Sequence, residues 1–173
     1  MKQRPVQFTI VRAQAEDAAA LLEYLKTVGG ETDNLSFGAE GVPLSIDEEA
    51  AYLRCQVDSA DNVQYFAKVD QQIIGTASLN RKPRRMRHRG ELGISLKKAY
   101  WGCGIASALM EEILCFAKAN GFAQLDLEVR SDNTRAIRLY EKYGFRKLCT
   151  FPDFFRIDGV SVDFDLMDLD LNA

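Results

Sequence analysis

The most informative part of this 173-residue chain is the segment Glu91-Leu92-Gly93-Ile94-Ser95-Leu96, followed shortly by Trp101-Gly102-Cys103-Gly104-Ile105-Ala106. The first part is predicted to be a strand, and the second opens an apolar-periodic run that predicts a helix over 105–120. Glycines at 102 and 104 let the backbone approach a ligand closely, and a helix start adds unpaired N–H groups and a positive dipole end. Such a turn suits a pyrophosphate, although a tight turn without a ligand would look the same by itself.

The rest of the chain supplies strands and helices on both sides of this centre. Gly29-Gly30 is predicted to stop the first helix, and Ser45 with Glu48 forms a capping box for the second. The pattern predicts a mixed α/β sheet with helices on both faces, but periodicity alone does not give the strand order. The expected strands are 6–12, 63–69, 72–79, 91–96, 124–129, 145–150 and 160–169, and the expected helices are 15–27, 46–57, 105–120 and 134–143.

Composition excludes several kinds of chemistry. One histidine, His88, and four cysteines without metal-ligand spacing give little material for a metal site or a histidine-based triad. The net charge of −3 disfavours nucleic acid, and the basic run 81–89 is interpreted as a solvated loop. No apolar run approaches the ~18 residues of a membrane span, and the N-terminus has no signal-like stretch. We therefore expect a cytoplasmic protein with no metal, no nucleic acid and no membrane partner.

A second motif, Asn133-Thr134-Arg135-Ala136-Ile137-Arg138-Leu139-Tyr140-Glu141-Lys142-Tyr143-Gly144-Phe145, follows the strand expected at 124–129. Together with 101–106 it resembles the GNAT superfamily of acyl-CoA-dependent N-acetyltransferases. The second motif matches at every fixed position, whereas Trp101 stands where the family prefers Gln or Arg. The resemblance implies one GNAT-like α/β domain over 1–173. Its sheet would be mixed, mostly antiparallel, of about seven strands splayed at the cofactor site and flanked by about four helices.

The resemblance also implies the site. Strand 91–96 would pair with the pantetheine arm, the turn would wrap the pyrophosphate, and Asn133 would contact the arm near the splay. Tyr140 would act as the general acid toward the departing thiolate. The residues expected to hold acetyl-CoA are Ile94, Ser95, Leu96, Gly102, Cys103, Gly104, Ile105, Ala106, Ser107 and Asn133.

The general base has three candidates. Glu128 matches a glutamate that accepts the amine proton in relatives resembling the ribosomal-protein alanine acetyltransferase. Glu91 opens the preceding strand, where other branches place a glutamate. A water chain in place of either carboxylate stays open, since both side chains could simply face solvent on a half-exposed strand.

The implied reaction is acetyl transfer from acetyl-CoA to a primary amine by direct attack. A catalytically inactive CoA-binding regulatory module is the alternative. The acceptor is expected to be a small-molecule or peptide amine, and a homodimer is left open. Segments 29–45 and 150–160 are expected to shape the acceptor pocket. The patch of Phe151, Phe154 and Phe155 is either core packing or a wall of that pocket.

Overall fold

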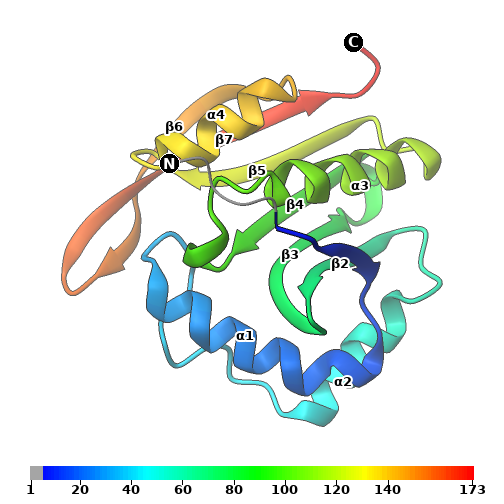
Figure 1. Ribbon diagram of the computed structural model, residues 1–173. Helices are drawn as coiled ribbons and strands as arrows, with labels where there is room; N and C mark the ends of the chain where they lie inside the picture. Colours follow the sequence, from blue (N-terminus) through cyan, green and yellow to red (C-terminus); the bar gives the residue numbers. More distant parts are fainter. Residues whose placement is uncertain (1–5) are drawn as a thin grey trace.

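The computed structural model describes residues 6–173, so residues 1–5 of the expected domain lie outside the described range (Figure 1). Three short 3-10 turns lie between the main elements, at Ala15–Asp17, Arg84–Met86 and Lys98–Tyr100. The main elements are β1 (Thr9–Arg12), α1 (Ala18–Glu31), α2 (Ile46–Gln56), β2 (Asn62–Val69), β3 (Gln72–Arg81), β4 (Arg89–Leu96), α3 (Ile105–Ala119), β5 (Gln124–Arg130), α4 (Thr134–Lys142), β6 (Arg146–Ile157) and β7 (Val160–Asp170).

The strands form one seven-stranded sheet in the order β1-β2-β3-β4-β5-β7-β6. Every neighbouring pair is antiparallel except β4 with β5, which is parallel. A parallel pair needs a crossover connection, and α3 provides it between these two strands. The predicted mixed, mostly antiparallel α/β fold is confirmed.

The sheet separates two layers of helices. α1 and α2 lie against one face, and α3 and α4 lie against the other, as Figure 1 shows. Leu109 and Ile113 of α3 pack with Leu125 and Leu127 of β5 in the larger core, while Leu21 of α1 belongs to the smaller one. Each layer buries the apolar stripe of its helices, which is the main source of their stability. No helix within residues 6–173 is long and apolar enough to cross a membrane.

The prediction that Gly29-Gly30 stops the first helix is wrong, because α1 continues through both glycines to Glu31. A Cβ added at Gly29 would lie 2.0 Å from the carbonyl oxygen of Gly38, and one at Gly30 would lie 3.3 Å from the Ala39 Cβ. The glycines are needed for close packing of the following loop on the helix. That use of glycine has no signature in the local sequence.

The C-terminal hairpin is longer than predicted. β6 runs from Arg146 to Ile157 instead of ending near 150, so the aromatic patch lies within the strand. Its register against β7 shifts between Phe151 and Phe155, and Asp153 has a positive φ of 54°. Extra residues in one strand are a β-bulge, which bends the strand and interrupts its alternation. That interruption explains why the pattern after 150 does not look like a strand.

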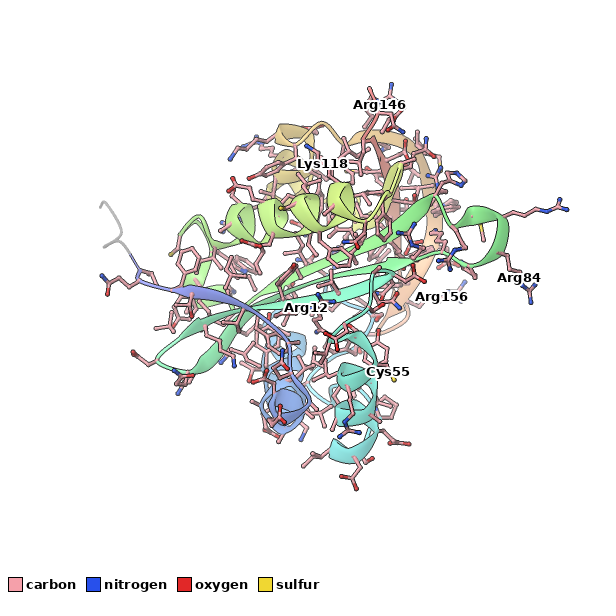
Figure 2. The ribbon with its side chains drawn as sticks, turned by 90° about the vertical axis from the view of Figure 1, so that its right-hand side faces the viewer. Arg12, Cys55, Arg84, Lys118, Arg146 and Arg156 are labelled. Atoms are coloured by element: carbon pink, nitrogen blue, oxygen red, sulfur yellow. The ribbon has the colours of Figure 1, made fainter. Side chains whose placement is uncertain are left out.

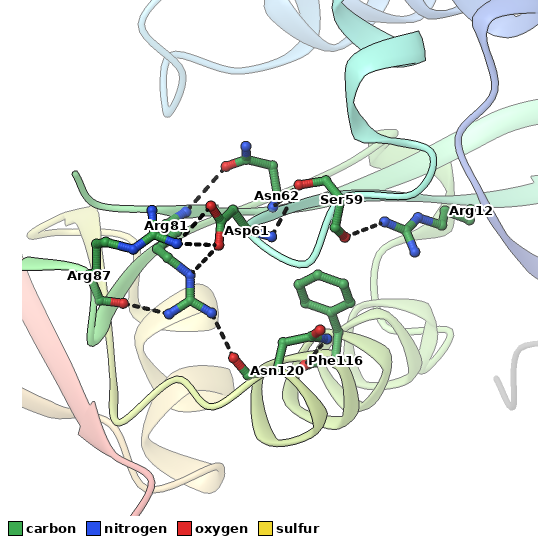
Figure 3. Close-up of polar contacts among 8 residues, drawn as sticks. All are labelled: Arg12, Ser59, Asp61, Asn62, Arg81, Arg87, Phe116 and Asn120. Atoms are coloured by element: carbon green, nitrogen blue, oxygen red, sulfur yellow. Dashed lines mark hydrogen bonds and ion pairs between the residues drawn. The ribbon is translucent and has the colours of Figure 1, made fainter. Parts of the chain in front are cut away.

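The basic run 81–89 forms the end of the β3–β4 hairpin, and most of its cations are paired. Arg81 lies 2.8 Å from Asp61 and donates to the Asn120 carbonyl (Figure 3). Its guanidinium also lies 3.7 Å from the centroid of the Phe122 ring. Arg87 also donates to Asp61. Arg84 projects away from the molecule at the tip (Figure 2). The interpretation as a solvated loop therefore holds for the tip and not for the whole run.

Candidate active site

The only parallel pair of the sheet comes apart along its length. β4 pairs with β5 from Arg89 to Glu91, opposite Gln124 to Asp126. Beyond these positions β4 continues with β3 alone, and β5 continues with β7 alone. The carboxyl ends of the two strands therefore splay apart. An extended ligand can pair with backbone groups that a neighbouring strand would otherwise occupy.

A groove of about 1220 Å³ lies at this splay and gathers most of the predicted cofactor residues. The part of its lining that the sequence predicted consists of Ile94, Ser95, Leu96, Gly102, Gly104, Ile105, Ala106, Ser107, Asn133 and Tyr140. α1 and the segment after it, from Glu31 to Leu35, form another side. Residues as far apart in the sequence as Glu31 and Tyr140 thus face one continuous space.

The turn before α3 fits a phosphate group. Gly102 and Gly104 both have φ of 81°, which disfavours any residue with a side chain. A Cβ added at Gly104 would meet nothing within 4 Å, so this side of the turn is open toward the groove. Gly104 is the N-cap of α3 and brings no side chain to its first N–H groups. Those N–H groups and the positive helix end favour an anion, so the residues present fit the pyrophosphate of CoA.

Five basic residues on the groove were not predicted. Three of them lie on α4 at Arg135, Arg138 and Lys142, a spacing of three and four residues that puts them on one side of a helix. Lys98 and Arg130 reach the same groove from other elements. The spacing on α4 was a signal in the sequence, and we expect these cations to attract the phosphate groups of CoA.

Asn133 lines the groove and also stabilises the start of α4. It is the N-cap of α4, and its Oδ1 accepts a hydrogen bond of 3.2 Å from the N–H of Ala136. An asparagine cap satisfies one of the donors that a helix start leaves unpaired. Asn133 therefore fixes where α4 begins, and with it the position of Tyr140 two turns later.

Tyr140 is the most deeply buried titratable residue of the groove lining, with 7% of its surface exposed. Its ring packs edge-on against Phe145 at 5.8 Å between centroids. Burial raises the pKa of Tyr140 to about 12. Within residues 6–173 no hydrogen bond of its hydroxyl is found. The phenol therefore stays protonated at any working pH and keeps its donor available to a ligand.

Ser95 contacts the smaller core through its side chain while its backbone follows the groove. Its Oγ lies 2.9 Å from the Tyr24 hydroxyl and 3.3 Å from Oγ1 of Thr76. Burial raises the pKa of Tyr24 far above its ordinary value, so this hydroxyl stays protonated. These hydrogen bonds tie α1 to β3 and β4 at the splay.

Glu128 and Glu91 do not line this groove. Leu125, Leu127 and Val129 of β5 are buried in the core under α3, so Glu128, between them, faces the opposite side of the sheet. Burial, together with the negative charge of Glu91, raises the pKa of Glu128, against the lowering effect of Lys82. Lys82 lies 3.9 Å from Glu91 and 2.6 Å from Asp126. The two carboxylates share the face that α1 and α2 cover further along the sheet.

Cys103 is the one predicted cofactor residue missing from the groove lining. It is half-buried in the turn and packs against the larger core. Its Sγ lies 4.0 Å from the Trp101 carbonyl. A small side chain at this position fills the inner side of the turn.

Strands that separate beside a helix N-terminus without a side-chain cap can hold a CoA thioester in the gap, with its phosphates at the helix. Fold and groove together define an acetyl-CoA-dependent N-acetyltransferase. Residues 31–145 match the model described as the acetyltransferase (GNAT) family, which is more than half of the chain. The chain therefore belongs to the GNAT acetyltransferase family.

Two curated relatives are similar at about one third identity. The N-alpha-acetyltransferase RimI of Mycobacterium tuberculosis is 32% identical over 111 residues, covering 64% of this chain and 68% of that protein. The L-amino acid N-acetyltransferase AaaT of Escherichia coli is 34% identical over 105 residues, covering 58% of this chain and 63% of that protein.

Solved structures match nearly the whole chain. A GNAT-family acetyltransferase of Streptococcus pneumoniae has a TM-score of 0.91 and 32% identity, covering 95% of this chain and all of that one (100%). The yncA protein of Salmonella typhimurium, solved with its cofactor acetyl-CoA, has a TM-score of 0.83 over 96% of this chain and 95% of that one. At 21% identity this second likeness shows the fold alone.

Proposed function

We propose that this chain transfers the acetyl group of acetyl-CoA to a primary amine by direct attack of that amine. The observation that carries the proposal is the splay of β4 and β5, with the turn at 102–107 at one end of the groove and Tyr140 in its lining. Acetyl-CoA, when bound, supplies an activated thioester. Holding two reactants in this geometry removes several kcal/mol of the barrier without a covalent intermediate on the protein.

Tyr140 is proposed as the general acid. In the balanced reaction the acetyl C–S bond breaks, a C–N bond forms, and the products are an N-acetyl amide and a CoA thiol. Tyr140 Oη donates the proton that the departing sulfur needs, the amine proton leaves through the base to solvent, and Tyr140 regains a proton from solvent before the next turnover. Burial keeps that proton on the oxygen between reactions, as the raised pKa of about 12 indicates. Removal of the hydroxyl alone therefore tests the role.

Glu128 is proposed as the base that takes the amine proton, with Glu91 as the alternative. Glu128 lies on the face of β5 opposite Tyr140's helix, so acid and base would act from the two sides of the splay. Its pKa, raised by burial and by Glu91, is closer to neutral than that of an ordinary carboxyl. A base with such a pKa accepts a proton more readily near pH 7.

The names of the two curated relatives favour an α-amine as the acceptor. One is named an N-alpha-acetyltransferase and the other an L-amino acid N-acetyltransferase. An α-amine has a pKa near 8, against about 10.4 for a lysine side chain, so it is more easily supplied in the neutral, attacking form. We therefore propose an amino acid or a peptide N-terminus as the acceptor.

The test is turnover of acetyl-CoA with a panel of amines, measured as thiol release and confirmed by mass spectrometry of the N-acetyl product. The panel includes amino acid amides, short peptides, a polyamine and an aminoglycoside. Product from an α-amine supports the proposal. Calorimetric binding of acetyl-CoA without turnover of any amine would instead identify an inactive CoA-binding module.

A further inference from the structure

Among residues 6–173, α1 and α2 cover only part of one face of the sheet. They pack on β2, β3 and each other, whereas β5 and β7 contribute Leu125, Leu127 and Met167 to the larger core, together with Tyr140 of α4 on the opposite face. In Figure 1 the β6–β7 hairpin extends beyond the other strands. The open face of β5, β7 and β6 lies on the same side as Glu128. It is therefore where an acceptor would approach the proposed base.

Three phenylalanine rings lie next to one another on this open face, and we call Phe151, Phe154 and Phe164 the aromatic wall. Phe154 lies 5.6 Å from Phe151 and 5.1 Å from Phe164, measured between ring centroids. Phe151 is opposite Phe164 in the strand register, and the bulge in β6 between Phe151 and Phe155 brings the Phe154 ring into contact with Phe164. Phe164 is buried, but Phe151 and Phe154 are 39% and 37% exposed.

The strand register places the wall beside Glu128. Leu166 of β7 is opposite Glu128, and Phe164, two residues away on the same face, is opposite Arg130. Phe151 of β6 is in turn opposite Phe164. Side chains in diagonal positions of an antiparallel pair have Cα atoms about 7–8 Å apart, within the length of one amino acid. Arg130 also lines the groove, so the wall adjoins the acetyl-CoA site.

The other side of Glu128 is polar and has an excess of negative charge. Two cations, Lys82 and Arg89, face the carboxylates of Asp126, Asp168 and Glu91 there. Glu128 adds a further carboxylate without an ion pair of its own among residues 6–173. This end attracts an ammonium group, while the wall attracts apolar surface.

We infer that the acceptor is a primary amine carrying an aromatic or large apolar group close to its nitrogen, such as an aromatic amino acid or a peptide that begins with one. This inference rests on the proposed function. The ammonium end is held at Glu128, the apolar group covers Phe151 and Phe154, and the thioester is reached through the splay. The negative charge on the polar side favours a small amine over a second copy of the chain as the occupant. A second copy would have to bury those carboxylates, which is costly.

The experiment compares two acceptors that share an α-amine and differ only in a phenyl group, L-phenylalaninamide and L-alaninamide. We expect kcat/KM to be at least about tenfold higher for phenylalaninamide, because its phenyl ring would be buried against Phe151 and Phe154. Phe154→Ala should lower that ratio at least about fivefold. Val160→Ala is the matched control, because Val160 is an exposed apolar residue of the same hairpin outside the wall, and it should leave the ratio unchanged.

A ratio near one in the parent protein, with alaninamide acetylated, overturns the inference and leaves the proposed function standing. If Phe154→Ala converts a dimer into a monomer in analytical ultracentrifugation without changing the ratio, the wall is a contact between copies and the inference is wrong. If no amine is acetylated, the proposed function fails. Calorimetry with CoA present then still tests the wall, which requires phenylalaninamide to bind more tightly than alaninamide.

Discussion

The guanidinium of Arg135 lies over the ring of Trp101, with its Cζ 4.9 Å from the ring centroid. Nε1 of the same tryptophan donates a hydrogen bond of 2.9 Å to the Leu96 carbonyl. Trp101 therefore connects the end of β4, the turn at 102–107 and the first turn of α4. We call this turn, which is proposed to hold the CoA phosphates, the phosphate turn. It stands where the family prefers Gln or Arg, and the cation at this place comes from Arg135 instead. A cation–π contact of this kind contributes about 0.5–2 kcal/mol.

Trp101→Ala is expected to weaken acetyl-CoA binding about tenfold, because it releases Arg135 and removes the hydrogen bond to β4. Calorimetry with acetyl-CoA measures the change. Arg135→Ala should weaken binding in the same direction, and the two changes together should cost less than their sum. Arg85→Ala, which removes an exposed arginine far along the β3–β4 tip, serves as the control. Additive effects of Trp101→Ala and Arg135→Ala would show that the two residues act independently.

Gly104→Glu is expected to abolish measurable acetyl-CoA binding in a folded protein, since it adds a negative side chain in the open side of the phosphate turn. Gly121→Glu is a close control. Gly121 also has a positive φ, of 70°, and a Cβ there would also meet nothing within 4 Å, yet it lies at the far end of α3. Both variants should lose similar stability in urea, about 1 kcal/mol from the backbone conformation. Equal acetyl-CoA affinity in the two would remove this turn from the site.

Tyr140→Phe should reduce kcat by about 10²–10⁴ while acetyl-CoA affinity changes little, because the ring stays and only the proton is lost. Single-turnover kinetics ensure that chemistry and not product release is measured. Tyr65→Phe makes the same chemical change on β2, outside the groove, and should have no comparable effect. A kcat for Tyr140→Phe within twofold of the parent would mean that this tyrosine only packs.

Glu128→Gln should lower kcat/KM near neutral pH, and the loss should shrink at high pH, where unprotonated amine is abundant. In the parent the acid limb of the kcat/KM profile should lie above the ordinary carboxyl range, since burial and Glu91 raise the pKa of Glu128. Glu91→Gln removes one of those causes and should move this limb to lower pH. If Glu91→Gln gives the pH-dependent loss and Glu128→Gln does not, the two roles are exchanged.

Asp165 anchors β6 and β7, and its replacement by Asn should destabilise the protein by about 2 kcal/mol in urea unfolding at pH 7. Burial raises the pKa of Asp165, but hydrogen bonds from Lys147, Ser131 and Thr150 outweigh it, and the pKa is lowered. A carboxylate whose pKa is lower in the folded than in the unfolded state stabilises the fold at pH values above its unfolded-state pKa. This stabilisation is lost as the pH falls through the folded-state pKa. The Asn variant should therefore lose less stability than the parent between pH 5 and about pH 3. Equal losses of stability in the parent and the Asn variant over this pH range would show that Asp165 is not the cause of the pH dependence.

The sequence predicted the centre of the site better than its surroundings. Gly102, Gly104, Asn133 and Tyr140 are recognisable because each belongs to a motif whose spacing is set within one turn or one helix. The structure places all four on one groove. Lys98 and Arg130 were missed, since a single basic residue in a loop or strand carries no sign of which space it will face.

Two errors in the fold have the same origin. Gly29 looks like a helix stop but serves the close approach of Gly38, and β6 looks finished at 150 but continues through a bulge against β7. In both cases the structure depends on contact with another segment of the chain, which the local sequence does not reveal. Tertiary packing overrides the local preference there.

The set of elements, the phosphate turn and the tyrosine can be predicted from the sequence, because they depend on periodicity and on residues a few positions apart. The point where β4 leaves β5, the face of the sheet that Glu128 shares with the aromatic wall, and the contact of Arg135 with Trp101 depend on the folded arrangement. Those relationships join segments whose proximity follows from strand order and register. Strand order and register are set by the burial of whole faces, which no single stretch of the chain encodes.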